Sequence, residues 1–267
     1  MVNFVLIAVC ILAGMIFKAT KAIHPDAHKG INTWILYLAL PAVSFKYLPK
    51  VEWSTEMLFP ILSTFLVAIG SWLFMMFYSK QKRYSARSRS TLEIISGYSN
   101  TSFIGFPLIS AFFGEKLLSI AIICDQTMFL ALSTLGIIAA VKGGSKSGKV
   151  SAQFILKRLF TFPPFLGCIS ALVISQFVNL DFAEPFFDKL ASTVAPLALF
   201  SVGLQLKFKG WKKLLPQMSV SMLYKLILAP AMVLVLALLL GIKGDIAKIS
   251  VFEAAMPTVV TSSIIAE

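Results

Sequence analysis

Charged side chains are scarce in this sequence. Asp, Glu, Lys and Arg make up 13% of the 267 residues, whereas soluble domains carry about 25%. Hydrophobic residues reach 58%, and the mean hydropathy is +0.85. So few charges cannot cover so much apolar surface in water. The composition therefore excludes a disordered chain and argues strongly against a soluble enzyme.

Cysteine and histidine are also rare. The three cysteines, Cys10, Cys124 and Cys168, lie in apolar runs and lack the spacing of metal ligands or of a disulfide framework. The two histidines, His24 and His28, are separated by a proline that opposes a helix through both. No paired carboxylates suited to magnesium are recognisable. We therefore expect no cofactor and no enzymatic activity.

Long apolar runs dominate what is present. A helix that crosses a bilayer needs about 20 mostly apolar residues. The predicted helices cover residues 2–18, 31–48, 57–78, 92–113, 117–141, 154–178, 186–206, 214–241 and 248–266. These runs are apolar on all sides and do not alternate strictly between apolar and polar residues, which favours helices over the strands of a barrel. The sequence therefore predicts an all-α polytopic membrane protein.

The basic residues give an orientation. The net charge is +12, and 17 of the 24 Lys and Arg residues fall in or beside the loops after the first, third, fifth and seventh predicted helices, against six on the other side. Basic loops stay in the cytoplasm, so we expect a multi-pass protein of the cell (inner) membrane with its N-terminus outside. Nucleic acid is a poor candidate partner. The glycine-rich segment 143–149 is followed by Val150, where a phosphate-binding loop has Ser or Thr. We therefore interpret it as a flexible linker.

Prolines suggest an internal repeat. Pro41 and Pro107 are 66 residues apart in the first half, and Pro196 and Pro257 are 61 apart in the second. Halves of five helices each insert in opposite orientations, and inverted repeats with matching broken helices are typical of secondary transporters. The first inverted repeat is predicted at residues 1–141, a basic cytoplasmic linker at 142–153, and the second inverted repeat at 154–267. The last helix of the second repeat, which would be the tenth, is not visible.

The fourth and ninth predicted helices carry the candidate binding site. Polar and helix-breaking residues interrupt the fourth, and Asn100 lies roughly 12 Å from its cytoplasmic end at 1.5 Å per residue. A packed proline kink is the alternative, but the matching break at Pro257 favours a site. Half-helix N-termini with unpaired amides would attract an anion there, and a carboxylate is the anion we expect. The candidate substrate-binding residues are Asn100, Thr101, Pro107, Pro257, Thr258 and Thr261.

Ionisable residues inside spans are costly and often functional. Glu253, and Asp125 followed by Gln126, are candidates for coupling transport to a proton or to sodium, with a sodium site near Glu253. Lys225 is their candidate charge partner. The alternative for all of them is a structural charge pair or a side chain that reaches toward the membrane surface.

The segment 100–108, Asn-Thr-Ser-Phe-Ile-Gly-Phe-Pro-Leu, resembles the helix-four signature of the auxin efflux carrier family, in particular its short bacterial members. Supporting matches are segments 40–42, 196–200 with Gly203, and 254–257. The resemblance covers essentially the whole chain.

This resemblance implies ten helices in two inverted five-helix repeats, as in the bile acid/sodium symporter fold. A scaffold domain would flank a transport domain whose two broken helices cross at Pro107 and Pro257. The resemblance also implies carriage of organic anions (auxin in plant members, small carboxylates in bacterial ones) with Asn100 in contact with the substrate. We expect as partners a small organic anion, a proton or sodium, the lipid bilayer and a second copy in a homodimer. The alternative function is a membrane sensor that binds a carboxylate without moving it.

Overall fold

The structure is a computed structural model, and it describes residues 2–51, 53–144, 151–206 and 211–259. Within these ranges all regular structure is helical, which confirms the predicted fold class at this level. The chain divides into two compact units. Unit 1 comprises Met1–Glu52, Ser102–Ile122 and Thr161–Lys209, and unit 2 comprises Trp53–Thr101, Ile123–Phe160 and Gly210–Glu267.

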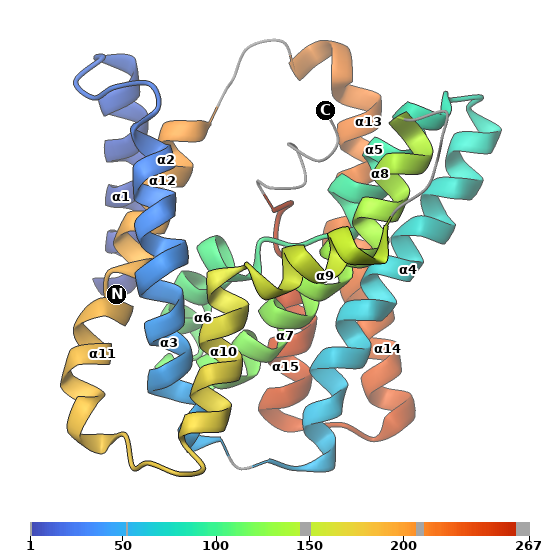
Figure 1. Cartoon of the computed structure of the whole chain (residues 1–267). Coiled ribbons are helices and arrows are strands. Elements are labelled where there is room, and N and C mark those ends of the chain that lie inside the picture. The colour runs from blue at the N-terminus through green and yellow to red at the C-terminus, as the bar shows by residue number, and fades with distance from the viewer. Residues whose placement is uncertain (1, 52, 145–150, 207–210, 260–267) are drawn as a thin grey trace. The chain divides into compact units, whose positions relative to one another are not determined.

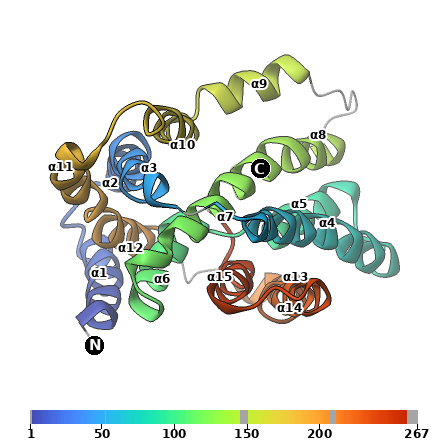
Figure 2. The same cartoon turned by 90° about the horizontal axis from the view of Figure 1, so that it is seen from below.

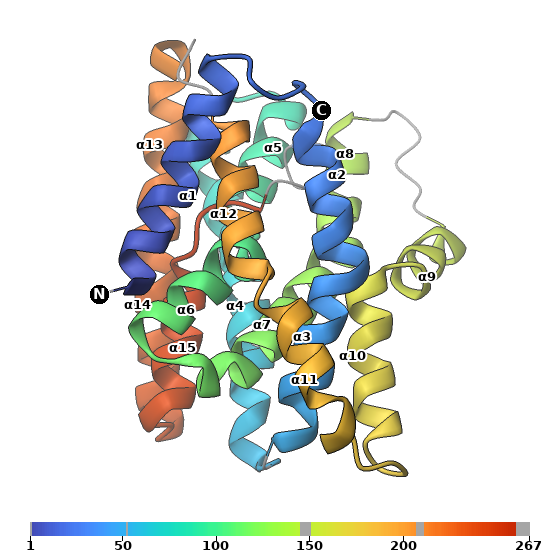
Figure 3. The same ribbon diagram turned by 90° about the vertical axis from the view of Figure 1, so that its left-hand side faces the viewer.

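Unit 1 is built around two sets of packed helices. Its helices are α1 (Val2–Ala19), α2 (Ala27–Trp34), α3 (Leu40–Tyr47), α6 (Phe106–Phe112), α10 (Pro163–Ile174), α11 (Glu184–Ala191) and α12 (Val194–Gln205). The first helix, α1, runs along α12, and α3 packs against both α10 and α11 (Figures 1 and 3).

Unit 2 packs its helices around an apolar core. Its helices are α4 (Leu58–Gln81), α5 (Ala86–Gly97), α8 (Ile137–Gly144), α9 (Ala152–Phe160), α13 (Leu215–Leu223), α14 (Ala229–Leu240) and α15 (Gly244–Ala254). Helix α7 (Leu118–Ala131) begins in unit 1 and continues into unit 2. The helices α14 and α15 lie side by side, as do α4 and α5 (Figure 2). Phe59, Met75, Tyr224 and Val233 are buried in one apolar cluster, where the Tyr224 hydroxyl donates to the Val67 carbonyl oxygen at 2.6 Å.

Several of the predicted spans are long and apolar enough to cross a membrane. Within the described residues these are Thr55–Gln81, Glu115–Gly143, Asp181–Gln205 and Leu215–Leu240, and α9 with α10 makes a fifth if the pair is one span. Shorter apolar helices occupy Asn3–Ala19 and Thr101–Phe112. The predicted helices at 2–18 and 57–78 agree closely with α1 and α4.

Two predicted helices differ from the structure, one in its continuity and one in the position of its break. The one at 154–178 is interrupted after Phe160, because Pro163 and Pro164 follow and cannot supply amide donors to a continuing helix. The one at 92–113 breaks at residues 98–100, earlier than expected, and Pro107 lies in the first turn of α6. The last predicted helix, at 248–266, ends at Ala254, and residues 260–266 lie outside the described chain.

Prolines also explain wide turns inside the helices. Of the four five-residue π-helical stretches in the described residues, three end two residues before a proline: Ile35–Ala39 before Pro41, Thr101–Gly105 before Pro107, and Tyr224–Leu228 before Pro230. The fourth, Leu132–Gly136, is not followed by a proline. A proline ring clashes with the carbonyl group four residues earlier, and in the first three stretches that residue is the central one. Widening the turn relieves the clash without ending the helix.

The contact between α1 and α12 depends on two glycines. A Cβ atom on Gly203 would collide with the carbonyl oxygen of Ile11 and lie 3.1 Å from the Cα atom of Gly14. A Cβ atom on Gly14 would lie 2.9 Å from the Leu204 backbone nitrogen. Small residues allow helices in membranes to approach this closely, so the two backbones meet without side chains between them.

We therefore expect Gly203→Ala to destabilise the protein by about 1–3 kcal/mol, because the added methyl group forces α1 and α12 apart. Thermal unfolding of the purified protein in detergent would show a melting temperature lower by several degrees. Gly30→Ala is the matched control, since no atom lies within 4 Å of the Cβ position on α2. Equal melting temperatures for the two variants would contradict this account of the helix contact.

Candidate functional site

Two interrupted helices meet in unit 2. The chain leaves α5 after Gly97 and is extended at residues 98–100, and it leaves α15 after Ala254 and is extended again near Pro257. The Asn100 amide donates to the Pro257 carbonyl oxygen at 2.7 Å, and the Val259 amide donates to the Tyr98 carbonyl oxygen at 3.2 Å. The two segments therefore pair as a short antiparallel ladder. Each segment bonds to backbone groups of the other that have no partner within a helix.

This pairing bears on the expectation of free amides at the breaks. The sequence predicts unpaired amides at the breaks that are available to an anion, but the amides of Asn100 and Val259 are each bonded to a carbonyl group of the opposite segment. These two backbone donors are therefore not available to a ligand. Side chains beside the paired segments are further candidate donors.

Buried and half-buried polar side chains surround the paired segments. Lys225, only 3% exposed, donates from its ammonium group to the Ser99 hydroxyl oxygen at 2.6 Å. The Thr258 hydroxyl donates to the Ile95 carbonyl oxygen at 2.5 Å. Asn100 is itself buried. The structure thus brings together Asn100, Pro257 and Thr258, with a cationic side chain bonded to the same ladder.

The acidic candidates lie on neighbouring helices of the same unit. Asp125, on α7, accepts hydrogen bonds from the Thr101 hydroxyl at 2.5 Å and from the Gln126 side-chain amide at 3.3 Å. Glu253, on α15, is 2% exposed, and neither of its carboxylate oxygens is hydrogen-bonded to a described residue. Its carboxylate interacts electrostatically with Lys225 and Asp125. The predicted coupling residues and the predicted charge partner thus belong to one buried cluster.

A small cavity adjoins Glu253. Its volume is about 10 Å³, which suits one water molecule or one small ion. Oxygen-bearing side chains line it: Ser63, Thr64, Thr101, Ser250 and Glu253. The hydroxyls of Ser63 and Thr64 both donate to the Pro60 carbonyl oxygen. Lone pairs on the two hydroxyl oxygens can therefore accept a hydrogen bond or bind a cation. Among the described residues, no group of three or more His, Cys, Asp and Glu residues is placed to hold a metal ion.

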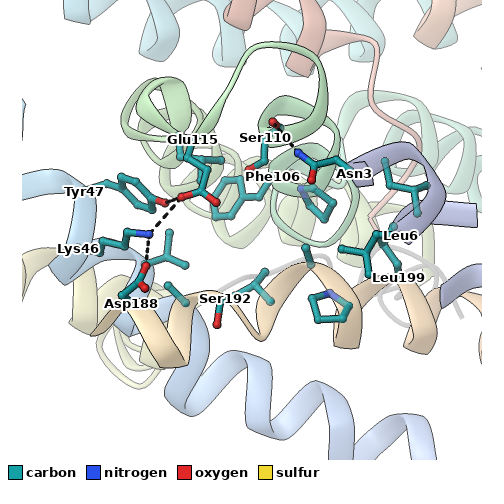
Figure 4. A pocket seen from close by; sticks show the side chains of 18 residues that line it. Asn3, Leu6, Lys46, Tyr47, Phe106, Ser110, Glu115, Asp188, Ser192 and Leu199 are labelled. Atoms are coloured by element: carbon teal, nitrogen blue, oxygen red, sulfur yellow. Dashed lines mark hydrogen bonds and ion pairs between the residues drawn. The ribbon is translucent and has the colours of Figure 1, made fainter. Parts of the chain in front are cut away.

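Two predicted site residues remain, Pro107 and Thr261. Pro107 belongs to unit 1, where it lines a pocket of about 210 Å³ with Phe106 and Ser110 (Figure 4). Thr261 lies outside the described residues. The roles of all these residues in substrate or ion binding stay predictions.

Some polar residues of the site in unit 2 could not be identified from the sequence. Ser63, Thr64 and Ser250 carry no recognisable motif, although the first two interrupt the apolar run at 57–78. Two adjacent hydroxyl residues inside an apolar span are a signal, but a hydropathy average over the span hides them. Only the fold shows that they face the same cavity as Glu253.

Apolar membrane helices with charged groups buried beside two interrupted segments are typical of polytopic membrane transporters. The sequence model of the membrane transport protein family matches residues 1–267, and the chain belongs to this family, that of the auxin efflux carriers.

The names of similar proteins agree with this assignment. An uncharacterized transporter of Methanocaldococcus jannaschii is 27% identical over 265 residues, covering 95% of this chain and 84% of the relative. An uncharacterized transporter of Methanothermobacter thermautotrophicus is 22% identical over 97% of this chain and 85% of its own length. A putative malonate transporter of Rhizobium meliloti is 29% identical over 88% of this chain and 76% of its own length.

The contribution of the hydrogen bond from Thr101 to Asp125 can be tested by measuring the thermal stability of variants. Thr101→Val removes a hydroxyl donor from a buried carboxylate and should cost about 1.5–3 kcal/mol, whereas Thr101→Ser keeps the donor. The measurement is thermal unfolding of the purified variants. Thr127→Val is the matched control, because that buried hydroxyl donates to the Ile123 carbonyl oxygen of its own helix. If both valine variants melt at the same temperature, the Thr101 hydroxyl does not stabilise Asp125.

Proposed function

We propose that this membrane transporter is a secondary carrier that moves a small organic anion, a carboxylate, by alternating access. The observation that carries the proposal is the Lys225 ammonium group, buried and bonded to Ser99 on the paired segments beside Asn100. A buried cation and a side-chain amide are the donors that a carboxylate needs in an apolar surrounding. The similarity to a putative malonate transporter supports malonate as the first substrate to test.

The division into two units supports a carrier with separate moving parts. From the first half of the chain, α1 to α3 belong to unit 1, whereas α4 and α5 belong to unit 2. From the second half, α10 to α12 belong to unit 1, and α13 to α15 belong to unit 2. Each unit thus draws on both halves, although the first half also returns to unit 1 through α6. Units that share helices from both halves support inverted repeats that build a scaffold and a transport domain.

We further propose that Glu253 and Asp125 couple transport to a proton or to sodium. Glu253 offers two buried carboxylate oxygens without hydrogen bonds to described residues, next to a cavity of the size of one small ion. Oxygen ligands suit a hard cation, and a buried carboxylate equally suits a proton. The electrostatic interaction with Lys225 would link the charge state of this position to the proposed anion site.

Counterflow in proteoliposomes tests the carrier function. Liposomes loaded with unlabelled malonate should accumulate labelled malonate through the wild-type protein. Asn100→Ala should raise the half-saturating concentration about tenfold, the loss of one hydrogen bond to a charged group. Asn179→Ala, in an exposed loop, is the control. A protein that binds malonate but gives no counterflow is a sensor, and a panel without binding or exchange of any carboxylate rejects the proposal.

Imposed gradients test the coupling. Glu253→Gln and Asp125→Asn remove the ionisable groups while keeping their shape, so malonate uptake should no longer respond to a proton or a sodium gradient. Each gradient is applied separately to oriented vesicles, and initial uptake rates are compared. Glu56→Gln, at an exposed turn, serves as the control. A gradient response that survives in both variants would show that the coupling ion, if any, binds elsewhere.

A further inference from the structure

A second polar position lies in unit 1, in the pocket that Pro107 lines (Figure 4). Three charged side chains and a tyrosine gather at one end of this pocket: Lys46 and Tyr47 of α3, Glu115 of the turn before α7, and Asp188 of α11. Apolar side chains form the other walls, with Leu6, Phe106 and Leu199 among them. The pocket therefore combines an apolar interior with one ionic end.

Lys46 is the centre of the ionic end. Its ammonium nitrogen lies 2.5 Å from the Asp188 carboxylate and 3.2 Å from the Glu115 carboxylate. The Tyr47 hydroxyl donates to the same Glu115 oxygen at 2.8 Å. The Lys46 side chain is 13% exposed, but those of Glu115 and Asp188 are 64% and 56% exposed. A largely buried cation is thus held by two carboxylates that water can reach.

Charge balance decides how another carboxylate could bind here. An ammonium group has three donors, and two of them are taken by Glu115 and Asp188. A third carboxylate added to one cation would leave two uncompensated negative charges. Exchange for one of the two resident carboxylates keeps the number of carboxylates bonded to the ammonium group at two and is the favourable route.

Glu115 is the partner that can leave. Its distance to the Lys46 ammonium nitrogen is the longer of the two. Glu115 also lies on a three-residue turn that follows Gly114, whose φ is +89°. Asp188, in contrast, is held on α11, which packs against the helix that carries Lys46. Opening the contact to Glu115 requires a change in a short turn, whereas opening the contact to Asp188 requires a change between packed helices.

We propose that Lys46 is a second carboxylate-binding position, where the substrate displaces Glu115 and places its carbon skeleton against the apolar wall formed by Phe106 and Pro107. The inference rests on the proposed transport of carboxylates and adds a place where the cargo meets unit 1. Since Glu115 ties the turn between α6 and α7 to α3, the same exchange releases that turn. The distribution of basic residues predicts this end of the spans to be outside the cell.

Cysteine protection tests this site without a transport assay. Ser192 lines the pocket and is exposed, so Ser192→Cys is introduced after Cys10, Cys124 and Cys168 have been replaced by alanine. Alkylation by N-ethylmaleimide is followed in detergent at increasing malonate, with chloride salt at equal ionic strength and malonamide as the uncharged analogue. Malonate should slow alkylation, and malonamide and chloride should not.

Variants then assign the effect to Lys46. Lys46→Gln should abolish protection, and Lys46→Arg should retain it. Glu115→Gln, which removes the competing charge, should lower the half-protecting malonate concentration about two- to fivefold. Lys50→Gln is the matched control, since Lys50 pairs with Glu184 near this end but does not line the pocket.

The outcomes separate this inference from the proposed function. Malonate counterflow by the wild type without protection of the introduced thiol, or with protection that persists in Lys46→Gln, overturns the Lys46 site and leaves the carrier function standing. Protection that depends on Lys46, in a protein without counterflow, establishes the site and rejects the carrier. Protection with an unchanged malonate dependence in Glu115→Gln overturns the exchange with Glu115.

Discussion

Backbone polar groups buried away from water have to be bonded to one another, and the site in unit 2 depends on that constraint. Two helices stop short, and the extended segments that follow satisfy each other through the Asn100 amide and the Pro257 carbonyl oxygen. That pairing fixes Ser99 and Thr258 opposite each other. Lys225 can then bond to Ser99, and Thr101, which follows Asn100, can bond to Asp125. The order of the polar cluster therefore follows from the backbone ladder.

The two units use different means to pack apolar helices. In unit 1, glycines on α1 and α12 bring two backbones together, which gives close contact where the hydrophobic effect contributes little in a lipid surrounding. In unit 2, large side chains such as Phe59 and Tyr224 fill the space between helices, and buried polar groups hold the interrupted segments. The proposed anion and ion positions lie in the second kind of packing, and the Lys46 pocket lies in the unit with the first.

Much of this could be predicted from the sequence. Long apolar runs determine the helices, and the break at Pro257 follows from the missing amide of proline. Other features depend on residues far apart in the chain. Lys46 meets partners 69 and 142 residues away, and no local pattern identifies them. The fourth helix breaks at residues 98–100 and not at Pro107, because pairing with a distant segment around Pro257 stabilises the extended backbone there.

The π-helical stretches before Pro41, Pro107 and Pro230 affect how related sequences should be compared. Each residue of an α-helix turns the chain by about 100°, and a wide turn accommodates one residue more than an α-helical turn. The faces before and after such a stretch are therefore offset by about that angle. A helical wheel drawn through one of these prolines will assign lipid-facing and buried positions to the wrong sides. Wheels for this family are best drawn anew after each proline, and a one-residue gap in an alignment at these points is physically reasonable.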